Sequence, residues 1–230
     1  MGITEPLRLW LGWSNAYLVS AGDGCLLIDA GIPGVAGRVF RAMAGRGLQP
    51  EDIRLIVVTH VHLDHVGSLR AIQERCGAPV MVSAAEADWL AQGTVVVPGG
   101  TTSYGQVSTT VLAGLNRLLP LRFAPCRAEY RVKGRESLAA FGLDGHIVDT
   151  PGHTAGSITV LGDNGDAFVG DLAVNHYPFN RGPIFPPFGD DGAAIYASWQ
   201  KLLDAGARRI YPGHGRPFPA ERLRERLARR

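Results

Sequence analysis

The sequence contains little cysteine and no apolar run long enough to cross a bilayer. Its three cysteines, Cys25, Cys76 and Cys126, are an odd number without the spacing of a thiolate metal site. No apolar run approaches the roughly 18 residues of a transmembrane helix, and residues 1–6 lack the charged-then-apolar pattern of a signal peptide. These absences predict reduced, buried thiols, no membrane span and a cytoplasmic location.

Lysine is also scarce, although the overall charge is balanced. Only Lys133 and Lys201 are lysines among 23 basic residues, which face 21 acidic ones and leave a formal net charge of +2. The arginine-rich stretch 222–230 is typical of a solvated terminal helix rather than a nucleic-acid or membrane patch. We therefore expect a small-molecule substrate as partner, no nucleic acid and no membrane, and we leave a homodimer open.

The chain is rich in hydrophobic residues, and its pattern indicates alternating strands and helices. With 230 residues, 46% of them hydrophobic, it fits one domain over 1–230 better than two small ones. Leu55–Val58 is a fully apolar strand, and Ser68–Arg75 has helical spacing. This alternation predicts an α/β architecture. The irregular segment at about 92–130, with a helix over 107–119, is predicted to be a lid or substrate-binding insertion, with a plain surface excursion as the alternative.

A run of metal-binding side chains directly follows the strand Leu55–Val58. It reads Thr59-His60-Val61-His62-Leu63-Asp64-His65. On an extended chain His60 and His62 point the same way, so convergence with His65 requires a turn near Asp64. Open α/β sheets place their sites at the carboxyl ends of strands, which is where this run lies.

Three more candidate ligands end apolar runs later in the chain, each with glycine before it: His153, Asp171 and His214 follow Gly152, Gly170 and Gly213. Glycine allows a sharp turn and a close backbone approach to a metal. His146 and His176 lie outside this pattern. The complete predicted ligand set is His60, His62, Asp64, His65, His153, Asp171 and His214.

These donors are all nitrogen or oxygen, and they suffice for two divalent ions. Zn is the first choice for imidazole and carboxylate, with Fe or Mn open. Two ions about 3.5–4 Å apart can share a water and lower its pKa from about 15.7 toward about 7. Asp64 is predicted to be catalytic as well as a ligand, because it could orient this nucleophile.

Other residues could assist the reaction from outside the ligand set. His176 and Tyr177 are catalytic candidates that could protonate a leaving group or stabilise an oxyanion, with solvent-facing loop residues as the alternative. Asp29 and Thr59 are predicted to orient imidazoles.

Together the motifs resemble the metallo-β-lactamase superfamily, most of all its glyoxalase II-like hydrolases, over nearly the whole chain. Leu27-Ile28-Asp29-Ala30-Gly31 resembles the first motif, and the run from His60 to His65 resembles the signature. The resemblance implies a four-layer αβ/βα sandwich. It also implies one metal held by His60, His62 and His153, a second held by Asp64, His65 and His214, and Asp171 as the bridge.

The resemblance implies hydrolysis of a small ester, thioester or lactone by a metal-bridging hydroxide. Asp171 stands where one group of β-lactamases has cysteine, and another group lacks the bridging aspartate, which argues against β-lactams. Only residues 217–230 lie beyond the last ligand motif, which argues against a glutathione thioester. A phosphodiesterase or nuclease, and an iron-dependent oxidoreductase acting on sulfur species, are the alternatives on the same fold.

Overall fold

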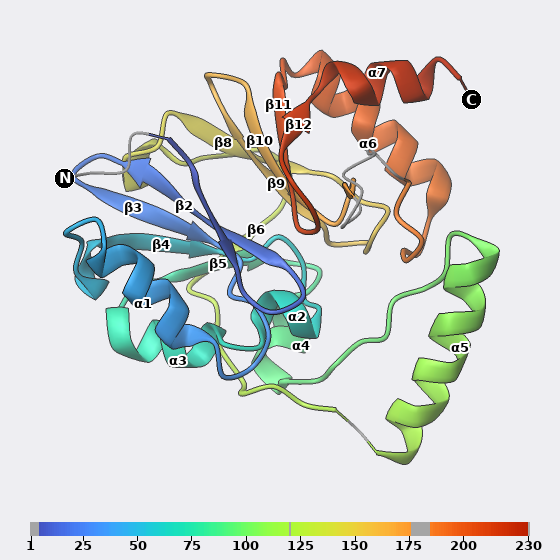
Figure 1. Ribbon diagram of the computed structural model, residues 1–230, viewed down its shortest axis with the longest axis horizontal. Helices are drawn as coiled ribbons and strands as arrows, with labels where there is room; N and C mark the ends of the chain where they lie inside the picture. Colours follow the sequence, from blue (N-terminus) through green and yellow to red (C-terminus); the bar gives the residue numbers. More distant parts are fainter. Residues whose placement is uncertain (1–4, 120, 176–184, 230) are drawn as a thin grey trace.

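A computed structural model of the chain describes residues 5–119, 121–175 and 185–229. It contains two six-stranded mixed sheets (Figure 1). In the first sheet the strands lie in the order β1 (Leu7–Trp10), β2 (Asn15–Ala21), β3 (Gly24–Ile28), β4 (Ile53–Val57), β5 (Val80–Ser83) and β6 (Tyr130–Val132). In the second they lie in the order β12 (Phe218–Pro219), β11 (Arg209–Pro212), β10 (Asp166–Gly170), β9 (Ile158–Gly162), β8 (Gly145–Asp149) and β7 (Glu136–Ser137).

The helices lie outside the two sheets, most of them on the outer faces and one beside the sandwich (Figure 1). They are α1 (Ala36–Ala44), α2 (Leu63–Val66), α3 (Leu69–Cys76), α4 (Ala87–Gln92), α5 (Ser103–Leu118), α6 (Gly192–Asp204) and α7 (Glu221–Leu227), with single 3-10 turns at Pro50–Asp52 and Ala139–Phe141. Figure 1 shows α1 and α3 on the side of the first sheet and α6 and α7 on the side of the second. The helix α1 buries Val39, Phe40 and Met43, a spacing that places them on one helical face.

The alternation of side chains between the two faces of each strand explains how the sheets and helices stack in layers. Successive strand side chains point to opposite faces. Leu18 of β2 therefore packs with the helices outside the first sheet, whereas Tyr17 packs between the sheets against Phe168 of β10. Ala167 of β10 belongs to a third cluster with Trp199 of α6. Three apolar cores separate four layers, and the predicted αβ/βα sandwich is confirmed.

The sequence did not predict every element. The strands β6, β7 and β12 are absent from the prediction, and α5 begins at Ser103 rather than Val107. The earlier start follows from Thr102, whose hydroxyl accepts a hydrogen bond from the Gly105 N–H at 3.1 Å and caps the helix. None of the helices among the described residues is long and apolar enough to cross a membrane.

Candidate metal centre

The predicted ligands leave the carboxyl ends of strands from both sheets. The run from His60 to His65 follows β4 of the first sheet. In the second sheet, His153 follows β8, Asp171 follows β10 and His214 follows β11. The structure thus brings together side chains that are more than 150 residues apart in the sequence.

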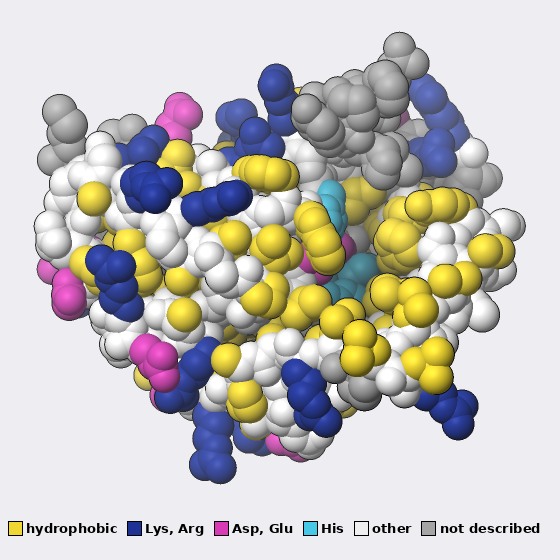
Figure 2. Space-filling model, turned by 60° about the horizontal axis from the view of Figure 1, so that its bottom comes forward, with side chains coloured by type: hydrophobic (Ala, Val, Ile, Leu, Met, Phe, Trp, Pro, Cys, Tyr) yellow, Lys and Arg dark blue, Asp and Glu magenta, His cyan; other side chains and the backbone are white. Residues whose placement is uncertain are grey.

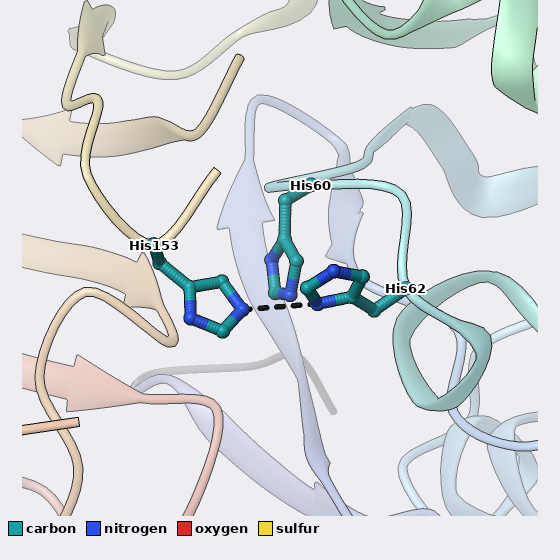
Figure 3. A group of neighbouring side chains, drawn as sticks. All are labelled: His60, His62 and His153. Carbon is teal, nitrogen blue, oxygen red and sulfur yellow. Dashed lines mark hydrogen bonds between the residues drawn. The ribbon is translucent and has the colours of Figure 1, made fainter. Parts of the chain in front are cut away.

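Three imidazoles form the first group. The candidate ligand atoms of His60, His62 and His153 lie within 4.8 Å of one another, and all three residues are buried. His62 Nδ1 and His153 Nε2 are 3.0 Å apart (Figure 3). Two nitrogens on a tetrahedral ion with bonds of 2.0–2.1 Å would be separated by about 3.3 Å, so this spacing fits a shared cation.

A second group forms around two carboxylates. His214 Nε2 lies 3.3 Å from Asp64 Oδ2 and 3.1 Å from Asp171 Oδ2. His65 Nε2 lies 3.4 Å from Asp171 Oδ1 and 3.7 Å from Asp64 Oδ2. Asp171 also approaches the first group, with Oδ2 3.8 Å from His153 Nε2. Its carboxylate therefore lies between the two groups.

Buried polar atoms without partners show that this donor set suits a cation. Among the described residues, the Nε2 atoms of His60, His62 and His65 and the Oδ1 atom of Asp171 are buried without a hydrogen-bond partner. Leaving such an atom unpaired costs about 1–3 kcal/mol. Metal coordination would satisfy the Nε2 atoms of His60 and His65 and the Oδ1 atom of Asp171, and imidazole and carboxylate are ligands for Zn, Fe or Mn.

Asp29 and Thr59 fix the orientation of two of these imidazoles. Asp29 lies 2.8 Å from His65 Nδ1 and accepts hydrogen bonds from the N–H and hydroxyl of Thr59. The Thr59 hydroxyl lies 3.0 Å from His60 Nδ1. Asp29 adopts a φ of 63°, a region that is sterically unfavourable for most residues with a side chain. These contacts direct Nε2 of both histidines toward the site.

Backbone carbonyls orient the ligands from the second sheet. His153 Nδ1 lies 3.0 Å from the Phe188 carbonyl, and His214 Nδ1 lies 2.9 Å from the Trp13 carbonyl. A proton on each Nδ1 would be donated to the carbonyl and leave Nε2 as the metal-facing atom.

Glu86 is a supporting residue that the sequence analysis missed. Its side chain is only 1% exposed and accepts hydrogen bonds from the Val61 N–H and the Thr154 hydroxyl. Val61 stands between His60 and His62, and Thr154 directly follows His153. One buried carboxylate therefore joins the loop of the first sheet to the loop of the second.

Electrostatics divides the site into a neutral and a charged half. Burial, reinforced by His153, lowers the pKa of His62 to about 3. Burial also lowers the pKa values of His60 and His153, so all three keep the neutral form that a metal ligand requires. Burial opposes the charge on His214, but Asp171 and Asp64 outweigh it and raise its pKa to about 10.

The two carboxylates are held ionised. Burial alone would raise the pKa of Asp64, but His65 and His214 lower it to about 2. The pKa of Asp171 is also lowered, because His214 and His65 outweigh its burial. Both carboxylates therefore supply negative charge for cations at neutral pH.

The glycines before the ligands permit the close approach predicted for them. An ideal Cβ on Gly213 would lie 2.3 Å from Asp171 Oδ1 and 2.8 Å from His65 Cε1. One on Gly170, whose φ is 53°, would lie 2.5 Å from Thr59 Oγ1. Side chains at either position would displace the ligand loops.

Some candidates from the sequence lie elsewhere. His176 and Tyr177 fall outside the described residues, so their catalytic roles stay predictions. His146 is on β8 near Arg135 and Asp163, in none of the ligand groups above. Its exclusion from the predicted ligand set agrees with this position.

Comparison with known proteins places this geometry among related folds. The model of the metallo-beta-lactamase superfamily matches residues 10–214. The probable metallo-hydrolase YflN of Bacillus subtilis is 25% identical over 93% of this chain and 85% of its own length. BLEG-1, a B3 metallo-beta-lactamase, has a similar fold, with a TM-score of 0.69, 18% identity, and coverage of 96% of this chain and 97% of its own. TTHA1623 was solved in a di-iron-bound form. It aligns with a TM-score of 0.67 and 24% identity, and the alignment covers 97% of this chain and 98% of TTHA1623.

Proposed function

The chain belongs to the metallo-β-lactamase superfamily, and from this premise we propose that it is a hydrolase with two metal ions that cleaves a small ester, thioester or lactone. Similarity to a probable metallo-hydrolase supports a hydrolase in general. The observation that carries the two-metal proposal is the position of Asp171, between the group of His60, His62 and His153 and the group of Asp64, His65 and His214.

Each ion would have its own side chains. His60, His62 and His153 would hold one, and Asp64, His65 and His214 the other. Asp171 would contact both. Two bound ions would supply an activated water and a polarised substrate carbonyl.

The chain's own residues would position the reactants. The side chain of Asp64 is 19% exposed, whereas that of His65 is fully buried, so Asp64 can reach a water in the cleft. Its carboxylate is ionised at neutral pH and can accept a proton from that water or orient it. Asp29, Thr59 and Glu86 would hold the ligand loops in place without touching substrate.

The surroundings of the site favour an uncharged carbonyl compound over a phosphodiester. Figure 2 shows histidine and acidic side chains in a hollow with hydrophobic side chains on both sides, while the visible Lys and Arg side chains lie farther out. Trp13, whose carbonyl faces His214, is 68% exposed. Nucleic-acid binding depends on basic side chains that neutralise phosphates, and the described residues that Figure 2 shows beside the hollow include few of them.

Zn is the metal we propose, with iron as the second candidate. The ligand set has no thiolate and suits either ion. Iron is kept because TTHA1623, a protein of similar fold, was solved in a di-iron-bound form. An iron centre would agree with the alternative of oxidoreductase chemistry on sulfur species.

Metal analysis followed by a substrate panel would test the proposal. Protein purified without added metal should contain two equivalents per chain. Lactones, thioesters, esters, phosphodiesters and β-lactams should then be tried on the wild type, on Asp64→Ala, and on the control His146→Ala, which alters a histidine outside the ligand groups.

We expect hydrolysis of carbonyl substrates by the wild type and His146→Ala, and little by Asp64→Ala. Equal turnover by all three proteins would refute the proposed site. Turnover of phosphodiesters alone would favour the nuclease alternative. Iron content with oxygen consumption on a persulfide would favour the oxidoreductase.

A further inference from the structure

The helix α5 carries an apolar face that is exposed and that the other described residues of the chain leave largely uncovered. Five of its residues recur at helical spacing, and we call them the apolar stripe: Tyr104, Val107, Val111, Leu115 and Leu118. Their exposures run from 58% at Leu115 to 83% at Leu118. Figure 1 shows α5 standing beside the sandwich at the end of two long connections.

Most of the stripe points away from the chain's own body, and only Tyr104 at its start contacts a ring there, that of Phe188, among the described residues. Only Gly105 and Thr109 of α5 are buried, and all residues of this helix are described. At about 100° per residue, every member of the stripe lies at least about 80° around the axis from these two positions. The second half of α5 has no buried residue, and because helices in proteins gain most of their stability from packing an apolar face, a further surface would stabilise it.

A glycine within the stripe indicates what kind of surface that is. Gly114 borders Val107, Val111 and Leu118 on the helix surface, and an ideal Cβ there would meet nothing within 4 Å. Glycine in a helix interior is destabilising, and packing within this chain does not require it. A small residue between larger apolar ones forms a notch that lets a second helix approach closely.

The charges of this region favour a second copy over a membrane. No acidic residue occurs between Asp88 and Glu129, and Arg117 is the only charged residue of α5. Helices that lie on membranes usually carry many Lys and Arg on the polar face. A nearly neutral stripe can instead face its own copy with little like-charge repulsion, as a two-fold interface requires.

We propose that two copies of this chain associate through their α5 helices, with the apolar stripes facing each other and the Gly114 notches at the crossing. The helix is about 24 Å long, and its stripe offers five large side chains to each partner. The interface would also adjoin the metal centre. Tyr104 contacts the ring of Phe188, with centroids 6.3 Å apart, and the carbonyl of Phe188 faces His153 Nδ1.

The test is the mass of the full chain in solution, measured by light scattering and sedimentation over a range of concentrations. We expect twice the 24.6 kDa chain mass for the wild type. Val111→Glu would place a charge in the stripe and should weaken the dimer at least about tenfold in Kd. Ala113→Glu is the matched control, because Ala113 is exposed on the opposite side of the helix and its variant should remain dimeric.

Gly114→Leu separates specific packing from general stickiness. Leucine favours the helix and adds apolar surface, so a non-specific patch would associate more strongly. A filled notch would instead hold the helices apart and weaken the dimer. Circular dichroism and metal content would show that each variant is folded.

Three outcomes would overturn the proposal. One is a monomeric wild type at every concentration. Another is tighter association of Gly114→Leu. The third is stripe-dependent sedimentation with phosphatidylglycerol vesicles by a monomer, which would assign the stripe to a membrane surface.

Discussion

Single residues carry much of the organisation of the metal centre, and only some of them could be identified from the sequence. Asp29 and Thr59 were identified as supports because each lies beside a recognisable motif. Glu86 could not be, because it lies in no recognisable motif, and a lone glutamate is typical of an ordinary solvent-facing charge. Its partners Val61 and Thr154 are 25 and 68 positions away.

Replacing Glu86 should weaken metal binding more than it changes the fold. Glu86→Ala would release both ligand loops, and loss of such a support typically costs about 10–100-fold in metal affinity. Glu86→Gln should be intermediate, because the amide keeps the shape but cannot accept every hydrogen bond. Competition with a chromogenic chelator would measure the affinity.

Asp88→Asn is the control for Glu86. Asp88 lies in the first turn of α4, the helix that follows Glu86, with its side chain 76% exposed and paired with Arg131. Its variant should bind metal as the wild type does. Equal affinity of Glu86→Ala and the wild type would show that the carboxylate does not position the ligands.

The cysteines should behave as inert thiols at neutral pH. Burial raises the pKa of Cys25 to about 12 and that of Cys126 to about 11. Since the thiolate is the reactive form, alkylation by iodoacetamide at pH 8 should be much slower in the folded than in the urea-unfolded protein. Rapid modification of the folded protein at pH 8 would contradict this.

The raised pKa values of Cys25 and Cys126 also predict how the stability of the fold changes at alkaline pH. A thiol whose folded pKa exceeds its unfolded value of 9.0 contributes stability below that value. The contribution should be lost as the pH rises from about 9 toward 12. Urea unfolding across this range should show a decline, and Cys25→Ala should reduce its steepness.

At the scale of elements, apolar patterning predicted most of the sandwich but not its edges. The residues Leu55–Val57 of β4 form a continuous buried run, and the run from His60 to His65 follows the carboxyl end of this strand. The strands β6, β7 and β12 have two or three residues each, and Glu136 and Ser137 of β7 are exposed. A strand of two or three residues forms only because a neighbouring strand pairs with it, and it is too short to show the alternating apolar pattern of a strand in the sequence.

The connection after β11 should tolerate no side chain before its ligand. Gly213→Ala would place a methyl group against Asp171 and His65, so we expect at least about tenfold weaker metal binding, the scale seen when ligand supports are removed. The unfolding midpoint of the metal-free protein should change less. Isothermal titration with Zn would measure the binding.

Gly37→Ala is the control for Gly213→Ala, because it adds the same methyl group at a glycine outside the ligand loops. Gly37 lies in α1 with nothing within 4 Å of an added Cβ. Its variant should bind metal normally and gain up to about 1 kcal/mol of stability from helix propensity. Unchanged metal binding in Gly213→Ala would mean that the loop can move aside freely.

At the scale of the whole molecule, the metal centre connects the two sheets. The first sheet supplies the loop from His60 to His65, and the second supplies His153, Asp171 and His214. The motifs alone predicted one set of seven ligands, but the two-sheet sandwich and the division of the ligands between two ions came only through the family resemblance. The apolar pattern of the strands predicts which residues are buried, but it does not predict how the strands divide into two sheets that pack on each other.

Metal removal should therefore destabilise the entire fold. A ligand at 100 times its Kd stabilises the folded state by about 2.7 kcal/mol, which for a chain of this size corresponds to about 5–10 °C in melting temperature. Calorimetry before and after treatment with a chelator would measure the shift. In the Asp171→Asn variant, the change in melting temperature on metal removal should be smaller. An equal melting temperature of the wild type with and without metal would contradict the role of the metal in joining the two sheets.

The division of the ligands between the sheets has a practical consequence. The short connection 133–135 separates β6 from β7, the last strand of one sheet from the first strand of the other. Two polypeptides made by opening the chain there would each contain an incomplete set of donors. Reassembly of the separately produced pieces could then be followed through recovery of ion uptake, as a complementation assay for the sandwich.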